Sequence, residues 1–435
     1  MTAAEQAAAA DRGNGAEVPP ARLWNRDFLL LWQGQFVSQL GTQAFAIAMV
    51  FWIKRQTDSA TLLGLATLAS TLPAALLGPL GGTFADRHSR RAILVAGDLV
   101  RGLASLALGA LLLTAPDRPR LILAALFAAA CVMGIADAVF RPAIQAAIPD
   151  LVPPARVASA NSLNRMALDV STFFGQGIGG VLFRLLGAAP LFLADGLSYL
   201  FAGASEWFVR LPPPAPRQRE SWRRAVAGLR RDLAEGLRHV WGRKGLRWLL
   251  FLSPLDNFFV VAIVVLLPFY VEDVLRVVPD WYGYLAAAFG AGSVVGSLLA
   301  GTVRLAGPTR SRVYLGFGFG FALAAGGLGL ARSPWVALGL VFAAAVMNGF
   351  NLIQVLSAMQ LTTPGRLRGR VFGLFETLAL SMVPLAAGTT GVVADLLDRD
   401  VAAIYRGCGA CLGVVALVLA ALPEVRAFLA DGERA

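Results

Sequence analysis

The chain has 435 residues, of which 57% are hydrophobic and only 15% are charged, and its formal net charge is +11. Soluble domains are about 45–50% apolar and about a quarter charged. This chain gathers its excess apolar residues into segments of about 20 residues, long enough to cross a bilayer core as helices. The composition therefore excludes a soluble protein, and the continuous apolar runs favour helices over a β-barrel.

Twelve membrane spans are predicted along the chain, so the expected fold class is an all-α integral membrane protein. The first six are expected near residues 27–53, 61–84, 92–114, 120–143, 159–184 and 189–210, and the second six near 247–271, 281–303, 313–331, 333–357, 371–395 and 400–422. Residues 1–24 lack the basic start and apolar stretch of a cleaved signal peptide, so we expect a retained, disordered N-terminus. Residues 423–435 are expected to form a short polar tail.

The positive charge is placed as in a membrane protein rather than a nucleic-acid-binding one. Most of the 38 Lys and Arg residues fall on the same predicted side as the N-terminus. This positive-inside bias predicts a plasma-membrane protein with both termini in the cytoplasm. Cys131, Cys408 and Cys411 all fall within predicted spans, where we expect small packing residues. No disulfide, metal site or cofactor is expected.

Residues 211–246 are predicted to form a cytoplasmic linker between two halves of the chain. The Pro-rich start "LPPPAPRQRE" ends the sixth span. From Ser221 onward, apolar residues recur at helical spacing with arginines on the other face. This pattern predicts an amphipathic helix on the inner leaflet that tethers the halves, with binding of a regulator as the alternative.

The two halves of the chain repeat each other. Matching residues occur at nearly constant spacing after the second span and near the end of the fourth span of each half: Gly82 and Gly301, Thr83 and Thr302, Arg91 and Arg310, Gly134 and Gly349, Gln145 and Gln360, and Pro149 and Pro364. Several matches at the same place in each half indicate parallel repeats. We therefore expect one six-helix bundle over residues 25–210 and a second, pseudo-symmetric one over 247–422.

A charged turn between the second and third spans carries a family resemblance. The stretch "GGTFADRHSRR" resembles the loop that marks the major facilitator superfamily of transporters, whose fold has two six-helix halves related by an axis along the membrane normal. The matching residues are Gly82, Asp86, Arg87, Arg90 and Arg91. The Gly that this loop usually has at the position of Ser89 is missing.

These residues predict a latch on the cytoplasmic gate. Gly82 lets helix backbones approach closely. The Asp86 carboxylate can meet an Arg or a helix N-terminus of the facing half in one transport state and leave it in the other. The alternative is that the arginines only enforce topology, a role that needs no carboxylate. Leu305 stands at the position of Asp86 in the second half, so we expect a one-sided latch.

Longer stretches resemble one branch of that superfamily, which contains the enterobactin exporter, transmembrane secretion effectors and macrolide-efflux proteins. The resemblance covers the first two spans and the segments "FRPAIQAAIPDLVPPARVASANSL" and "QLTTPGRLRGRVFGLFE". It implies a transporter rather than an enzyme, and efflux without naming a substrate. A signature of the drug antiporters is imperfect, because "GQGIGG" has Gln176 where that group has Pro.

Polar residues within the spans indicate the transport pathway, since they are expensive against lipid. They recur at helical spacing in spans that the superfamily resemblance places around a central cavity: Gln35, Gln39, Gln43, Asn164, Arg165, Asp169, Asp256, Asn257, Asn348, Asn351 and Glu376. Asp169 and Asp256 lie deep in their spans, where burial allows a carboxyl group to take up and lose a proton. The alternative for them is a permanent salt bridge. Asp98 and Arg101 are expected to form a structural pair or part of the gate.

These features together predict a monomeric secondary transporter that exports an amphipathic small molecule, such as an antibiotic or a siderophore, by alternating access coupled to protons. One alternative is an importer or a lipid translocator of the same fold, since fold does not set direction. Another is a membrane receptor or assembly partner that does not transport, although polar stripes in both halves count against it. The expected partners are the small molecule, protons and the lipid bilayer, and not nucleic acid.

Overall fold

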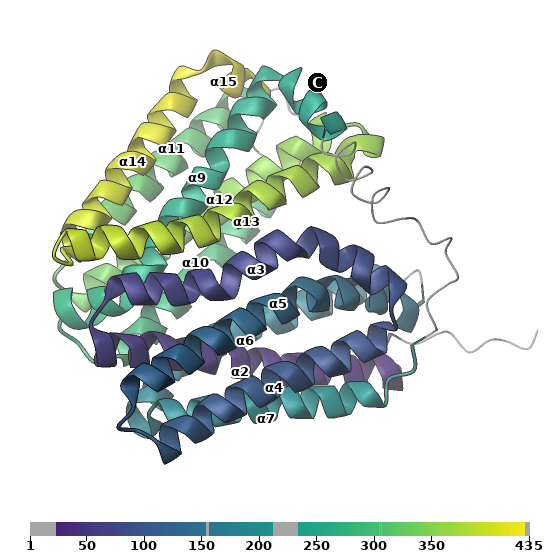
Figure 1. Cartoon of the computed structure of the whole chain (residues 1–435). Helices are drawn as coiled ribbons and strands as arrows, with labels where there is room; N and C mark the ends of the chain where they lie inside the picture. Colours follow the sequence, from purple (N-terminus) through teal and green to yellow (C-terminus); the bar gives the residue numbers. More distant parts are fainter. Residues whose placement is uncertain (1–22, 154–155, 212–233, 304, 306, 431–435) are drawn as a thin grey trace, which may run out of the picture.

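The computed structural model describes residues 23–153, 156–211, 234–303, 305 and 307–430, and these are helical almost throughout (Figure 1). The first half contains α2 (Arg26–Thr57), α3 (Ala60–Arg87), α4 (Arg90–Thr114), α5 (Pro119–Leu151), α6 (Val157–Leu186) and α7 (Ala188–Trp207). The second half contains α9 (Lys244–Phe269), the π-helical turn η2 (Tyr270–Val274), α10 (Asp280–Thr302), α11 (Gly307–Leu328), α12 (Pro334–Thr362), α13 (Gly365–Leu396) and α14 (Val401–Ala421). The short helix α15 (Pro423–Ala430) follows.

Short polar residues set where several of these helices begin. The side chains of Asn25, Ser59, Ser89 and Asp400 accept hydrogen bonds from backbone N–H groups in the first turns of α2, α3, α4 and α14. Those N–H groups would otherwise lack a partner. α2 ends at Asp58, whose φ of 48° closes the helix in a left-handed turn. The connection between α2 and α3 is therefore a tight turn with both flanking helix ends capped.

Nine helices in the described part of the chain are long and apolar enough to cross a membrane. A tenth span follows if the two parts of α6, Ser159–Gly175 and Gly177–Leu186, count as one. The helices α7 and α11 occupy two further predicted spans, but each carries two charged residues that lower its mean hydropathy. The multi-pass membrane character is confirmed, and the count of twelve spans stays a prediction.

Among the segments that differ from the expected boundaries are the end of α5 and the C-terminal tail. α5 continues past residue 143 to Leu151, although it contains Pro142 and Pro149. Ile144 and Ile148 are buried in the core of the first half, and this packing outweighs the backbone hydrogen bonds that the prolines remove. The tail expected after residue 422 begins with helix α15, which packs on α9 and α11.

Two predicted segments fall largely outside the described residues. These are the N-terminal segment up to residue 22 and residues 212–233, which contain most of the predicted amphipathic helix. The end of the linker is described from residue 234 onward. There Glu235 forms an ion pair of 2.5 Å with Arg370 of α13, and Val240 is fully buried. This part of the linker is therefore attached to the second half.

The same pairs of helices pack together in each half (Figure 1). In the first half, α3 lies against α5, α4 against α5 and α7, and α2 against α6 and α7. In the second half, α10 lies against α12, α11 against α12 and α14, and α9 against α13 and α14. Between the halves, α3 packs on α13 and α6 packs on α10. Helices at the same place in the chain order of each half therefore make the same contacts.

Two glycines matched by the sequence repeat hold equivalent positions. A Cβ atom on Gly134 of α5 would collide with the backbone of Ser70 in α3, and one on Gly349 of α12 would collide with the backbone of Ser293 in α10. Only a residue without a side chain allows these helix pairs to approach so closely. The sequence match thus marks the same helix contact in both halves.

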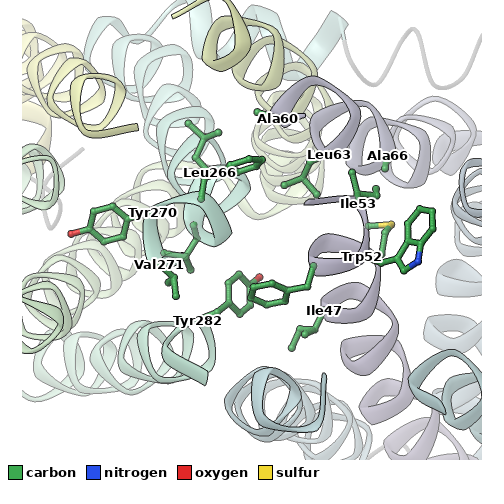
Figure 2. Packing of buried hydrophobic residues seen from close by; sticks show 14 of the residues in the cluster. Ile47, Trp52, Ile53, Ala60, Leu63, Ala66, Leu266, Tyr270, Val271 and Tyr282 are labelled. Carbon is green, nitrogen blue, oxygen red and sulfur yellow. The ribbon is translucent and has the colours of Figure 1, made fainter. Parts of the chain in front are cut away.

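Buried apolar residues join the two halves at one end of the molecule. The cluster there combines side chains of the first half, such as Ile53 and Leu63, with Leu266, Tyr270 and Tyr282 of the second half (Figure 2). The other clusters of described buried residues each lie within one half. We call the joined end, with residues 57–60, 270–280 and 395–400, the closed end. The opposite end, with residues 88–89, 211 and 234, is called the linker end.

Candidate functional site

Three of the predicted pathway residues line one small cavity inside the second half. Asp256 of α9 and Asn348 and Asn351 of α12 border a space of about 30 Å³, which Tyr314 of α11 and apolar residues of α14 complete. This volume is enough for a water molecule. The cavity lies among helices of one half, so these side chains form a polar site within the second half rather than between the halves.

The polar groups at this cavity are only partly satisfied. The amide of Asn351 donates a hydrogen bond of 3.2 Å to the backbone oxygen of Tyr314, while its buried Oδ1 atom accepts none from the described residues. Among the described residues, no cation pairs with the half-buried Asp256 carboxylate. Asn257 is engaged elsewhere, because its amide donates a 2.7 Å hydrogen bond to the backbone oxygen of Ala379 in α13.

The predicted pathway residues of the first half are not gathered at one place. Gln35 is 3% exposed, and its amide donates a 2.7 Å hydrogen bond to Oε1 of Glu206 in α7. Gln43 donates a longer one, 3.4 Å, to Thr172 in α6. The other first-half members differ in exposure, with Gln39 and Asn164 half-buried and Arg165 exposed, and Glu376 of the second half is also exposed.

The basic part of the predicted gate motif contacts its own half. Arg90 donates a 3.0 Å hydrogen bond to the backbone oxygen of Ala146 and pairs with the Asp150 carboxylate, both in α5. The guanidinium of Arg91 lies 5.1 Å from the ring centre of Trp207 in α7. Several predicted site residues lie outside those whose surroundings the structure describes, namely Gly82, Asp86, Arg87, Asp169 and Gln176. The latch role of Asp86 stays a prediction.

The expected pair of Asp98 and Arg101 is present, and it belongs to a larger buried cluster that the sequence analysis missed. Arg101 binds Asp98 over 2.6 Å and Asp137 of α5 over 2.9 Å. Glu206 of α7 is 1% exposed and lies beside Asp98. Asp195 of α7 is also fully buried and accepts a 2.7 Å hydrogen bond from a serine of α4. The missed signal was a polar stripe at helical spacing in the sixth span.

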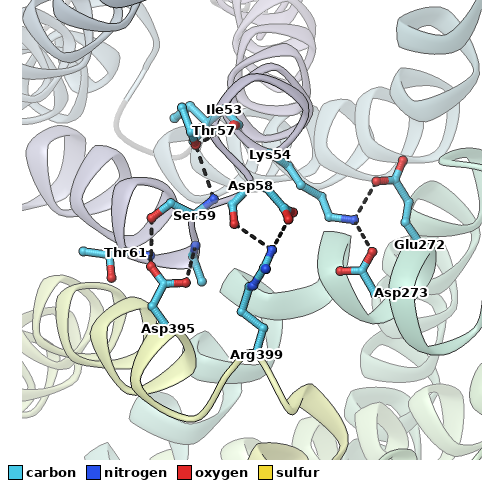
Figure 3. Close-up of polar contacts among 11 residues, drawn as sticks. Ile53, Lys54, Thr57, Asp58, Ser59, Thr61, Glu272, Asp273, Asp395 and Arg399 are labelled. Carbon is cyan, nitrogen blue, oxygen red and sulfur yellow. Dashed lines mark hydrogen bonds and ion pairs between the residues drawn. The ribbon is translucent and has the colours of Figure 1, made fainter.

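Charged side chains connect the halves at the closed end (Figure 3). Lys54, near the end of α2, is 5% exposed, and its Nζ atom lies 2.7 Å from Oε2 of Glu272 and 2.9 Å from Oδ1 of Asp273. In the adjacent turn, Asp58 pairs with Arg399 of the second half. The hydrogen bond to Asp58 raises the pKa of the Arg399 guanidinium. Each of these contacts joins the first half to the second.

A carboxylate of the second half caps a helix of the first half (Figure 3). Asp395, near the end of α13, accepts hydrogen bonds from the Ser59 hydroxyl over 2.8 Å and from the backbone N–H groups of Ala60 over 3.1 Å and Thr61 over 2.9 Å. These donors form the start of α3. A negative charge is stabilised at this position by the unpaired N–H groups and the positive end of the helix dipole.

The contact between α6 and α10 adds a further ion pair at the closed end. Arg184 donates two hydrogen bonds, of 3.0 and 3.1 Å, to the Asp280 carboxylate. One turn earlier, Gly180 of "GQGIGG" lies against the backbone of Pro279 and Asp280. Among the described residues, the ion pairs between the halves all lie at the closed end. Those described at the linker end lie within the first half, join the linker to the second half, or join the linker end of α9 to α15.

Comparisons with known proteins place these features among membrane transporters. The sequence model of transmembrane secretion effectors matches residues 18–433. Macrolide efflux protein A of Streptococcus pyogenes is 26% identical over 292 residues, which cover 67% of this chain and 69% of that protein. The enterobactin exporter EntS of Shigella boydii is 26% identical over 418 residues, which cover 92% of this chain and 93% of that protein.

Solved structures share the fold at low sequence identity. The crystal structure of a bacterial homologue of the iron transporter ferroportin, in an inward-facing state, has a TM-score of 0.69 at 19% identity and covers 91% of this chain and 99% of that one. The crystal structure of a D-xylose–proton symporter has a TM-score of 0.67 at 17% identity and covers 92% of this chain and 98% of that one.

Proposed function

Because the chain belongs to the transmembrane secretion effector family of the major facilitator superfamily, we propose that it exports an amphipathic small molecule across the plasma membrane by alternating access. It is a multi-pass membrane transporter and not an enzyme. Relatives that are efflux proteins support outward transport. The names of two of these relatives specify macrolides and enterobactin, so these are the compounds to test first.

One observation carries this proposal. The halves share a buried apolar core and ion pairs at the closed end, whereas each half has its own core at the linker end. A transporter that works by alternating access must seal one end while the other end is parted. The positive-inside bias favours a cytoplasmic linker end. In this proposal, the structure represents an inward-open state that takes substrate from the cytoplasm or the inner leaflet, with both termini cytoplasmic.

The moving bodies in this proposal are two six-helix bundles, over residues 25–210 and 247–422. The repeated helix packing supports this division, as do the equivalent glycine contacts of α5 and α12. The cytoplasmic linker 211–246 joins the bundles, and residues 1–24 and 423–435 flank them. Each chain contains both sides of the gate, so the protein works as a monomer.

Protons drive the cycle in this proposal. A proton that moves inward across 100 mV releases about 2.3 kcal/mol. Asp256 is the proposed proton carrier, because its carboxylate borders a polar cavity and has no described cation beside it. Asp86 with Arg87, Arg90 and Arg91 is the proposed gate latch. The remaining predicted pathway residues are assigned to substrate contact: Gln35, Gln39, Gln43, Asn164, Arg165, Asp169, Asn257, Asn348, Asn351 and Glu376.

Everted membrane vesicles test the proposal directly. Uptake of a labelled macrolide and a labelled catecholate siderophore would be measured with and without an imposed proton gradient. We expect gradient-driven uptake of at least one compound, and its loss in Asp256→Asn. Asp117→Asn is the matched control, because Asp117 is an exposed carboxylate in the loop between α4 and α5.

Other outcomes separate the alternatives. Uptake by right-side-out vesicles alone would make the protein an importer. Transbilayer movement of a labelled phospholipid without uptake of either compound would make it a lipid translocator. Equal gradient-driven uptake by wild type and Asp256→Asn would refute the role of Asp256. Absence of transport of both compounds and of lipid, by correctly inserted protein, would contradict export of this class of compound.

A further inference from the structure

A cluster of ionisable side chains crosses the first half between α2, α4, α5 and α7. Asp98, Arg101 and Glu206 are 0%, 4% and 1% exposed, and Asp137 at the edge of the cluster is 34% exposed. Arg101 is committed to Asp98 and Asp137 through ion pairs of 2.6 and 2.9 Å. Aromatic rings of α5 and α7 cover the guanidinium. The Glu206 carboxyl group therefore lies in a dry site without an ion pair of its own.

Three buried oxygen atoms of this cluster accept no hydrogen bond from the described residues. One is Oδ1 of Asp195, and the other two are Oδ2 of Asp98 and Oε2 of Glu206. The two carboxyl groups lie within hydrogen-bonding reach of each other. Ionised carboxylates only accept hydrogen bonds, so two of them cannot bond to one another. A single proton on the pair creates one donor and one acceptor, and it satisfies both oxygen atoms.

The charges around the pair disfavour ionisation of both carboxyl groups. α4 contributes Arg101, α5 contributes Asp137, and α7 contributes Asp195 and the phenol of Tyr199, while α2 contributes the neutral amide of Gln35. One described guanidinium thus faces four carboxyl groups, of which those of Asp98, Asp195 and Glu206 are buried and that of Asp137 lies at the edge of the cluster. Buried carboxylates without compensation are strongly unfavourable, and proton binding neutralises them.

We propose that Asp98 and Glu206 bind one proton between them, forming a buried proton-binding site that links α4 to α7. The proton makes an O–H···O hydrogen bond between one oxygen atom of Asp98 and one oxygen atom of Glu206. Arg101 balances the one negative charge that the pair retains. Gln35 holds Glu206 in position through the 2.7 Å hydrogen bond to Oε1. This inference does not depend on the substrate, direction or coupling of transport, and the site is separate from Asp256.

Infrared spectroscopy of the purified full-length protein in lipid nanodiscs measures this proton. At neutral pH only protonated carboxyl groups give the C=O stretching band of a carboxylic acid, which shifts in D₂O. The spectrum of wild type would be compared with those of Glu206→Gln, Asp98→Asn and the double variant. Glu206→Gln keeps the shape of the side chain, and its amide can donate to Asp98, so α4 and α7 stay paired.

The double variant makes the test specific for a shared proton. We expect each single variant to remove the same band, and the double variant to remove no further band. Retention of the band in both single variants would overturn the proposal. Loss of two separate bands in the double variant would show two independently protonated groups and would also overturn it. Asp117→Asn, which changes an exposed carboxylate, is expected to leave the spectrum in this region unaltered.

Discussion

Lys54 of α2 and Glu272 of η2 form an ion pair of 2.7 Å between the two halves of the chain. Asp273 provides a second carboxylate 2.9 Å from the same ammonium group, which is 5% exposed. A buried cation has lost its hydration, so these carboxylates are its main source of compensation. Glu272 and Asp273 retain access to water, which screens the pair in part. Lys54 is therefore a buried cation whose compensation comes from the other half of the chain.

Replacing Lys54 by Met should open the closed end more often. Loss of about 1 kcal/mol of attraction would raise the open-to-closed ratio about fivefold. Spin labels at Asp117→Cys and Ser333→Cys, in a background without the three native cysteines, report the distance between the loops α4–α5 and α11–α12. Pulsed electron resonance should show a larger long-distance population in Lys54→Met. Lys244→Met is the control, because Lys244 pairs with Glu424 inside the second half.

Asp395→Asn should weaken the contact between α13 and the start of α3. The change keeps one acceptor oxygen but removes the negative charge that the three donors and the helix dipole stabilise. We expect a loss of about 1 kcal/mol in stability, measured as a lower midpoint of thermal unfolding in detergent. Asp398→Asn, three residues later in an exposed turn with a φ of 48°, should leave that midpoint unchanged. Equal midpoints for the two variants would argue against the cap.

Gly349→Ala should destabilise the packing of α12 on α10. The added Cβ atom meets backbone atoms of Ser293, so one helix must shift, at a cost of about 1–3 kcal/mol. Gly339→Ala in the same helix is the matched control, because no atom lies within 4 Å of the added Cβ. Alanine there should be neutral or stabilising by up to about 1 kcal/mol. Comparison of the unfolding midpoints of the two variants tests the close approach of α12 to α10. A lower midpoint in both variants, or in neither, would contradict it.

Asp86→Asn should slow transport without abolishing substrate binding. The proposed latch stabilises one of the two gate states relative to the other. Its loss changes how fast the protein passes from one gate state to the other. The initial rate of uptake should fall severalfold, while the affinity measured by equilibrium binding stays within about twofold. Wild-type uptake rates in this variant would leave the basic residues with only a topological role.

The continuous apolar segments of the chain were enough to predict most of the described helices, because a span needs only length and apolarity. They could not predict that α5 runs through Pro142 and Pro149, since that depends on side chains of other helices that bury Ile144 and Ile148. Local hydropathy carries no information about such tertiary packing. The match of Gly134 with Gly349 did carry it, because a close helix contact requires a missing side chain at one position.

The candidate site was less predictable than the fold. Asp256 was singled out from one span and Asn348 and Asn351 from another, and the structure brings them together at one cavity. Glu206 was missed, because a carboxyl group near the end of an apolar segment resembles the start of a polar loop. Its partners, Asp98 and Gln35, lie more than a hundred residues earlier in the chain, so only the folded packing shows that this group is buried.

The shared core at the closed end also has a consequence for how the chain is made. Glu272 follows Lys54 by 218 residues, so at 5–20 residues per second the ribosome needs about 10–45 s between them. During that interval the first half can complete its own core, but Lys54 and the apolar surface around Ile53 and Leu63 have not met their partners. The newly inserted first half is thus an incomplete intermediate that membrane chaperones or proteases can recognise. Substitutions at the closed end should consequently lower the yield of protein as well as alter its function.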